Sequence, residues 1–177
     1  MRNRSTKNTE LARRERFMHK AIGVAERGIH ADQMPFGAAV VRNGRVIACQ
    51  HNSVRADKDP TAHAEVSCIR AACRKLRRRD LSDCEIFSTC EPCAMCAGAC
   101  YAAGVAAIYF GAYIADKEIC GLPDLGVGAA VISELSSLAP LTIGGVCRAR
   151  CVELFRLYTK ISKPNPTTLS KTVAGKR

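Results

Sequence analysis

Residues 89–96 read TCEPCAMC, and a further cysteine, Cys100, follows four positions later. A stretch this rich in cysteine suits a disulfide, a redox centre, a structural zinc site or a catalytic metal site, because all four use the Cys-x-x-Cys spacing. The choice among them depends on which other residues of the chain lie beside Cys93 and Cys96.

Length and composition indicate one globular domain. A chain of 177 residues can bury a substantial core, and 47% hydrophobic with 24% charged residues is ordinary for a soluble protein. No apolar run approaches the ~20 residues that span a membrane, and the N-terminus lacks the apolar segment of a secretory signal. We therefore expect a cytoplasmic protein with no membrane partner.

The eleven cysteines are a high and odd count. In a small secreted chain they would indicate a disulfide framework, but no export signal is visible and most of them stand in apolar surroundings. A buried free thiol packs as a small hydrophobe. We expect core packing, in a reducing compartment, for Cys49, Cys68, Cys73, Cys147 and Cys151.

The net charge of +11 is unevenly distributed. Residues 1–20, 70–80 and 148–177 are strongly basic, whereas residues 81–147 sum to −6 from seven acidic residues and one basic residue. A polyanionic partner such as RNA fits the basic parts, and so does a solvated face with two polar tails. Only 5% of residues are aromatic and none is Trp, which weakens any stacking platform for single strands.

Strand and helix patterns alternate along the chain, which predicts a layered α/β sheet. Two β-rich runs in FGAAVVRNGRVIACQ flank Asn43-Gly44, the pattern of a tight hairpin. Pro92 is expected in the first turn of a helix. Helices are expected at residues 63–78, 93–103, 129–138 and 147–160, and strands at CEIFST, VAAIYFG and LTI.

The ends of the chain read as basic tails around one domain. We expect tails at residues 1–12 and 161–177 and a folded domain at 13–160. A helix is expected near the start of the domain, because Phe17 and Ala21 share an apolar stripe with the residues that follow them.

His63, in DPTAHAEV, is the candidate partner of Cys93 and Cys96. One imidazole and two thiolates leave one position of a tetrahedral zinc ion open, as in catalytic sites. A fourth ligand from Cys90 or Cys100 would close the site and make it structural. Cys100 lies one helical turn beyond Cys96 on the same side, so it could point toward the metal, but we expect it in the core.

Glu65, two residues after His63, favours catalysis over a structural role. A carboxylate beside a metal-activated water takes its proton and passes it to a leaving group. Helix N-termini at His63 and Cys93 would favour anions at the same place.

His-x-Glu followed by Pro-Cys-x-x-Cys matches the signature of zinc nucleobase deaminases. Residues 17–158 resemble the cytidine deaminase-like superfamily, in its branch of guanine deaminases, cytosine deaminases and tRNA adenosine deaminases. PFGAAVV, HNSV, DPTAHAEV, CEPCAMCAGA and AIYFGA match that branch in order and spacing. The resemblance implies a three-layer α/β/α fold with a central mixed five-stranded sheet, and at least a homodimer.

By that resemblance His63, Cys93 and Cys96 hold one Zn²⁺ per subunit and Glu65 moves protons. The metal would activate water for attack on the amine-bearing ring carbon, and ammonia would leave. Asn52 matches the position that hydrogen-bonds the base, although Asn after a strand is commonly a turn residue. Backbone N–H groups near Ala64 and Cys93 would meet an oxygen of the reacting base.

Two further residues resemble the guanine deaminase pattern. Phe36, after Pro35, stands where an aromatic ring lies against the purine, and a plain core position is the alternative. Asp124, in GLPDLG, falls near acidic loop residues that contact the substrate, and an exposed turn is the alternative. A carboxylate there would accept hydrogen bonds from the N1–H and 2-amino groups of guanine.

Other features depart from that pattern. Glycine in LTIGGV replaces a late glutamate, and Leu-Pro-Asp replaces Phe-Asp-Asp. The CAMCAGACYAAG segment and the basic C-terminal helix resemble tRNA adenosine deaminases instead, but the loop after FGA lacks their Gly-Ala-rich signature. Docking of tRNA would use the basic stretch of Arg74, Lys75, Arg77, Arg78 and Arg79.

We therefore expect a zinc-dependent hydrolase of purine metabolism that deaminates a free nucleobase, guanine to xanthine and ammonia. The alternatives are a tRNA adenosine deaminase, which forms inosine in an anticodon loop, and a deaminase of cytosine or another amino-heterocycle. A small nucleobase is the expected partner and tRNA the less favoured one. An RNA-binding module with a structural zinc is the rival from another class.

Overall fold

The computed structural model describes residues 4–122, 126–135 and 139–162. Five strands form one mixed sheet in the order β2-β1-β3-β4-β5, with β1 antiparallel to β2 and β3, and β3, β4 and β5 parallel. The strands are β1 Gly37–Arg42, β2 Arg45–His51, β3 Cys84–Cys90, β4 Ala107–Ala112 and β5 Leu141–Ile143. The helices are α1 Arg4–His30, α2 Val54–Asp57, α3 Ala64–Leu76, α4 Ala94–Ala102, the 3₁₀ helix η1 Ile114–Cys120, α5 Ala129–Leu135 and α6 Arg148–Ile161.

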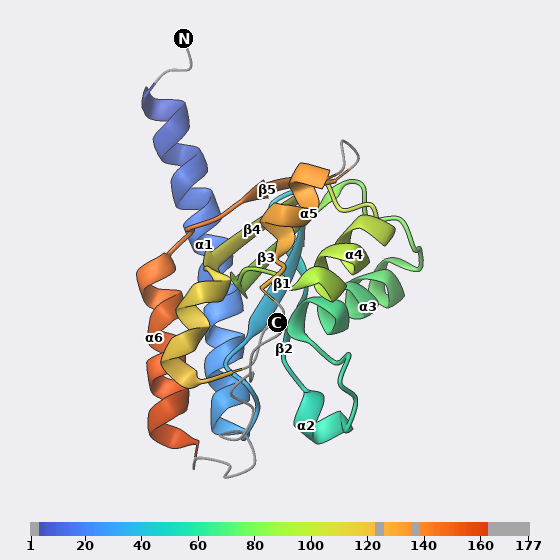
Figure 1. Ribbon diagram of the computed structural model, residues 1–177. Coiled ribbons are helices and arrows are strands. Elements are labelled where there is room, and N and C mark those ends of the chain that lie inside the picture. Colours follow the sequence, from blue (N-terminus) through green and yellow to red (C-terminus); the bar gives the residue numbers. More distant parts are fainter. Residues whose placement is uncertain (1–3, 123–125, 136–138, 163–177) are drawn as a thin grey trace, which may run out of the picture.

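Helices cover both faces of the sheet, which confirms the predicted three-layer α/β/α fold. Figure 1 shows α1 and α6 on one face and α3 and α4 on the other. The strand β1 illustrates why both faces are apolar, since successive side chains point to opposite sides of a sheet. Ala39 and Val41 pack with α1 and α6, whereas Ala38 and Val40 pack with α3 and α4.

The hairpin between β1 and β2 forms where the sequence predicts it. Asn43 and Gly44 both have positive φ, 49° and 71°. Two consecutive left-handed residues are required by the turn whose twist matches that of paired strands, and Asn-Gly adopts them readily. The hairpin leads β2 to the edge of the sheet, with Asn52 just beyond its end.

The N-terminal helix is longer than the sequence predicts. α1 begins at Arg4, so residues 4–12, expected as a tail, are helical, and in Figure 1 this first part extends past the body of the domain. Arg13 donates to the Glu85 carboxylate at 2.7 and 2.8 Å and to Glu10 at 2.8 and 2.9 Å. These ion pairs tie the polar part of α1 to β3, an interaction that the apolar stripe does not reveal.

The other boundaries differ from the expected ones by a few residues. Pro92 precedes the N-cap of α4, Cys93, instead of lying in the first turn. The expected C-terminal tail begins at the last residue of α6, Ile161, and residues 163–177 lie outside the described residues. Within the described part of the chain, no helix is both long enough and apolar enough to cross a membrane.

Close packing of α6 against β4 depends on Gly111. A Cβ added there would meet the Cys151 side chain, with its Cβ 2.8 Å away, and the Thr89 carbonyl oxygen at 3.0 Å. We predict that Gly111→Ala lowers the free energy of unfolding by about 1–3 kcal/mol, because the helix must shift away from the strand. Urea unfolding measures this change.

The matched control is Gly23→Ala in α1, where the nearest atom to an added Cβ is in the flexible Arg27 side chain at 3.9 Å. This variant should gain about 0.5–1 kcal/mol from helix propensity. Equal stability of the two variants would contradict the packing described for Gly111.

Candidate active site

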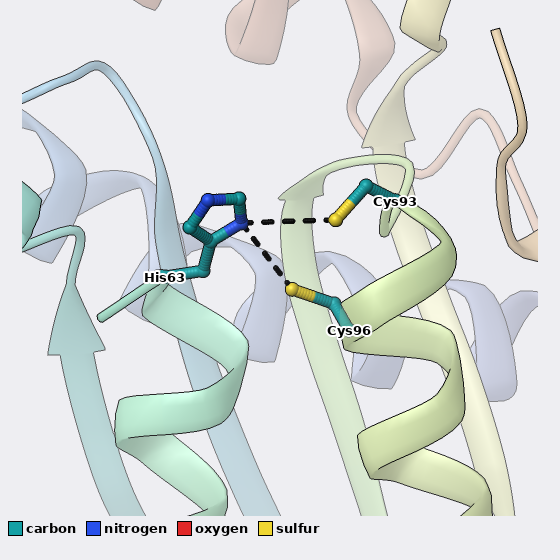
Figure 2. Close-up of side chains that lie close together, drawn as sticks. All are labelled: His63, Cys93 and Cys96. Atoms are coloured by element: carbon teal, nitrogen blue, oxygen red, sulfur yellow. Dashed lines mark hydrogen bonds between the residues drawn. The ribbon is translucent and has the colours of Figure 1, made fainter. Parts of the chain in front are cut away.

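Two helix N-termini bring the predicted metal ligands together. His63 is the N-cap of α3 and Cys93 is the N-cap of α4, with Cys96 in the first turn of α4. Figure 2 shows the imidazole of His63 facing both sulfur atoms across the gap between the two helices. His63 Nδ1 lies 3.7 Å from Cys93 Sγ and 3.4 Å from Cys96 Sγ.

This spacing fits a tetrahedral zinc ion. With Zn–N of about 2.0 Å and Zn–S of about 2.3 Å, tetrahedral angles separate nitrogen from sulfur by about 3.5 Å. The ligand atoms of His63, Cys93 and Cys96 all lie within 4.8 Å of one another. The three side chains can therefore bind one ion without rearrangement, with one coordination position left over.

The site also favours the thiolate form that metals require. The pKa of Cys93 is lowered to about 4, chiefly because the Cys96 thiol donates a hydrogen bond to it and also because His63 lies beside it. The pKa of Cys96 is raised because this thiol retains the shared proton and is buried. The pKa of His63 is raised, first by its hydrogen bond with Cys93, while burial and the charge of Lys117 oppose the shift.

Neither candidate for a fourth ligand belongs to the cluster. Among the described residues, the group of metal-binding side chains consists of His63, Cys93 and Cys96. Cys100 is fully buried in the core between the sheet and α4, the expected position. Cys90 lies closer, at the end of β3, where it lines the neighbouring pocket.

Glu65 is buried beside the cluster. Its side chain is 6% exposed, and one carboxylate oxygen accepts a hydrogen bond from Ser88 Oγ at 3.1 Å. Burial raises the pKa of Glu65 because the charged form loses its hydration. Ala64, the first residue of α3, is buried between Glu65 and His63 and places a first-turn N–H at the same end of the helix.

A pocket of about 330 Å³ opens next to these residues. Residues from both sheet and helices surround it: Phe36, Asn52, His63, Glu65, Cys90, Glu91, Cys93 and Lys117.

Asn52 lines this pocket and carries an unpaired hydrogen-bond donor. The residue is 1% exposed, and its Oδ1 accepts a hydrogen bond from the Val54 N–H at 3.2 Å. Its Nδ2 is buried without a hydrogen-bond partner in the described residues. An unpaired buried amide costs about 1–3 kcal/mol, so a bound molecule with an acceptor would remove a penalty that the folded chain carries.

Phe36 lies both in the core and at the pocket, and its contact with a purine ring stays a prediction. Its ring packs against the core in an edge-on contact with Phe155, with centroids 6.0 Å apart. It also lines the pocket, and its carbonyl oxygen accepts from the Asn52 N–H at 2.9 Å. The backbone bond holds Phe36 and Asn52 at a fixed separation along the same wall.

Three neighbours of the site are absent from the sequence prediction. Ser88 lies on the buried strand β3 and Glu91 just after it, while Lys117 lies in η1. Lys117 has one signal in the sequence, since it is the one basic residue in positions 81–147. The predicted contact Asp124 lies outside the described residues.

The comparisons with known proteins agree with this geometry. Residues 11–112 match the family model described as the cytidine and deoxycytidylate deaminase zinc-binding region. A guanine deaminase of Bacillus subtilis is 42% identical over 111 residues, which are 62% of this chain and 71% of that protein. A tRNA-specific adenosine deaminase of Aquifex aeolicus is 40% identical over 109 residues, with the same coverage of 62% and 71%.

A solved structure of a guanine deaminase from Nitrosomonas europaea superimposes with a TM-score of 0.76 at 29% identity. The match covers 82% of this chain and 84% of that one. The chain therefore belongs to the cytidine and deoxycytidylate deaminase zinc-binding family. It is a zinc-dependent deaminase whose metal site consists of one histidine and two cysteines.

Zinc content tests the three-ligand assignment. We predict that the purified chain holds one zinc ion and that Cys96→Ser loses it during dialysis against a mild chelator. Cys90→Ala and Cys100→Ala should each retain one ion, because neither sulfur atom belongs to the cluster. Metal analysis by atomic emission checks all four proteins, and loss of zinc from either alanine variant would contradict a site with an open position.

Proposed function

We propose that the chain deaminates a free nucleobase, with guanine converted to xanthine and ammonia. The observation that carries this proposal is the pocket beside the metal ligands, which is small and presents the unpaired amide of Asn52. A single base offers carbonyl oxygen and ring nitrogen atoms as acceptors. The relatives support a purine, since the guanine deaminase and the tRNA adenosine deaminase match at similar identity.

When bound, the zinc ion supplies an activated water at neutral pH. Glu65 takes the proton of the attacking water and delivers it to the departing amine, a role that suits a carboxylate held beside the ligands with a raised pKa. Ser88 fixes the orientation of that carboxylate by its hydrogen bond. The side chains that bind the ring line the same pocket.

Asn52 donates to an acceptor of the base, and Phe36 lies along the ring. The N–H groups at Ala64 and Cys93, at the starts of α3 and α4, meet oxygen on the reacting base. Asp124 remains a proposed contact to the N1–H and 2-amino groups of guanine.

The position of the basic stretch favours a free base over tRNA. His63 precedes the first residue of α3, whereas Arg74 and Lys75 lie in its last turn. Thirteen residues of helix separate them by about 20 Å. Lys75 also donates to the Ile47 carbonyl at 2.9 Å, and Arg78 pairs with Asp83, so both are engaged within the domain.

We also propose a homodimer that forms through α4. This helix contains no charged residue, and Met95, Gly98 and Tyr101 are exposed on its outer face. An added Cβ at Gly98 would meet nothing within 4 Å, so another backbone can approach closely. A second copy offers the same uncharged face, as a two-fold interface requires.

All eleven cysteines are free thiols, which supports a cytoplasmic location.

Ammonia release measures the proposed activity directly. The zinc-loaded chain should release ammonia from guanine and not from adenine, cytosine, guanosine, cytidine or a tRNA with adenosine at position 34. Glu65→Gln should retain zinc and lose at least ~10³-fold in kcat, because the proton carrier is gone. The control Glu153→Gln, on the far side of the sheet in α6, should retain full activity.

Two results would contradict this proposal. Turnover of the tRNA alone would replace guanine with adenosine in an anticodon loop, and turnover of cytosine alone would assign the site to a pyrimidine. Undiminished turnover in Glu65→Gln would remove Glu65 from the chemistry.

The interface proposal is tested by sedimentation. Tyr101→Glu puts a charge on the apolar face of α4. It should raise the dimer dissociation constant by at least ~10-fold and so shift the protein from dimer to monomer. The control Ile161→Glu alters an exposed apolar residue at the end of α6 and should leave the dimer intact. A monomeric wild type, or a dimer insensitive to Tyr101→Glu, would contradict the proposal.

A further inference from the structure

Lys117 brings a positive charge to the pocket from an otherwise acidic part of the chain. It is the one basic residue among positions 81–147, which contain seven acidic residues. The side chain is half-buried, lines the pocket with Asn52 and Glu65, and places Nζ 6.0 Å from the centroid of the Phe36 ring. A cation at the face of an aromatic ring is attracted to it, so Phe36 helps to hold the ammonium over the cavity.

The segment that carries Lys117 is anchored at several points. At its start, the Tyr113 N–H donates to the Asp116 carboxylate at 2.8 Å, which Arg148 binds through two donors at 3.0 and 2.8 Å. The Ile114 N–H donates to Glu91 at 3.4 Å. Near its end, the Thr159 hydroxyl of α6 lies 3.4 Å from the Ile119 carbonyl oxygen and 2.9 Å from the Phe155 carbonyl oxygen, two acceptors that share its one hydrogen.

Glu91 joins this segment to the metal site. Its carboxylate accepts from the Ile114 and Ala130 N–H groups at 3.4 and 3.1 Å, and it stands two residues before the ligand Cys93. The backbone of η1 is therefore positioned relative to the metal before any ligand binds. Binding groups on such pre-positioned elements lose little entropy when they engage a ligand.

Lys117 and Asn52 give the pocket two donors. The ammonium has three N–H groups and no acceptor, and the Asn52 Nδ2 is also a donor, with no partner in the described residues. Glu65 and the metal ligands occupy the wall where the amine must react. A ring that binds with its amine toward Glu65 therefore meets donors along its other edges.

We propose that Lys117 is a specificity-determining residue, which selects amino-heterocycles that present a carbonyl oxygen or ring nitrogen acceptor on an edge remote from the reacting amine. This inference rests on the proposed free-base deaminase activity. It deepens that activity by assigning the choice of ring to a residue outside the metal site. A base with an amino group in place of the carbonyl would turn a donor toward the ammonium, and this base would bind less well.

Guanine and 2,6-diaminopurine test this choice because they share the 2-amino group and differ at C6. Guanine has an oxygen acceptor there, and 2,6-diaminopurine has an amine donor. Initial rates of ammonia release at fixed pH give kcat/KM for each base, and product analysis identifies which amine leaves. The proteins are the zinc-loaded wild type, Lys117→Met, Lys117→Arg and, as a control for lost charge elsewhere, Lys160→Met in the exposed last turn of α6.

The wild type should prefer guanine, and Lys117→Met should reduce the ratio of kcat/KM values for the two bases by about 10- to 100-fold, the range of a hydrogen bond to a charged group. The loss should appear in KM for guanine with kcat nearly unchanged, because Lys117 binds the ring in both ground state and transition state. Lys117→Arg should restore most of the ratio, and Lys160→Met should equal the wild type. Zinc content and melting temperature confirm that each variant is folded and loaded.

Two outcomes overturn different claims. If the wild type deaminates guanine and Lys117→Met leaves the ratio unchanged, the role of Lys117 is wrong while the activity stands. If the wild type deaminates neither base, the proposed function fails and the inference about Lys117 fails with it.

Discussion

The approach of His63 to the two sulfur atoms of α4 is the contact on which the active site depends. It joins the N-termini of α3 and α4, which pack on the same face of the sheet. Each ligand is placed by the start of a helix, where unpaired N–H groups and the helix dipole favour negative charge. The Cys96 thiol and His63 also lower the pKa of Cys93, which favours the thiolate form that binds zinc.

The sheet places the remaining groups around this contact. Parallel strands β3 and β4 end beside each other, and the segments that follow them carry Cys93 and Lys117. The antiparallel hairpin brings Phe36 and Asn52 to the same end from the other direction. Ligands of open α/β sheets bind at the carboxyl ends of parallel strands, where loops from neighbouring strands meet. The pocket follows that rule, and its lining residues Phe36, Asn52 and Lys117 come from elements outside the ligand-bearing helices.

Residues with strong local signals could be predicted from the sequence. Asn43-Gly44 defines its turn by backbone conformation alone. His63, Cys93 and Cys96 are residue types that bind metals, and each stands at the expected start of a helix. The alternation of strands and helices also has a local signal, and it predicted the layered fold. By contrast, the sequence pattern does not reveal the ion pair between Arg13 of α1 and Glu85 of β3, because these residues are distant in sequence and follow no apolar period.

The residues that line the pocket were predicted only in part, because some of them depend on contacts between distant parts of the chain. Glu91 acts through backbone N–H groups of two later segments, and Lys117 lies in a 3₁₀ helix within a long connection. Neither position has a periodic pattern, and Lys117 reaches the pocket only when tertiary contacts place the connection after β4 beside it. Phe36 illustrates the limit as well, since the sequence could not decide between core and pocket and the residue contributes to both.

The central claim is a zinc ion held by three protein ligands with one position open for water. X-ray absorption spectroscopy at the zinc edge tests it most directly on the purified, zinc-loaded chain. The account predicts two sulfur ligands at about 2.3 Å and two nitrogen or oxygen ligands at about 2.0–2.1 Å, one of them from solvent. A third sulfur ligand, from Cys90 or Cys100, would show a closed structural site and contradict the account.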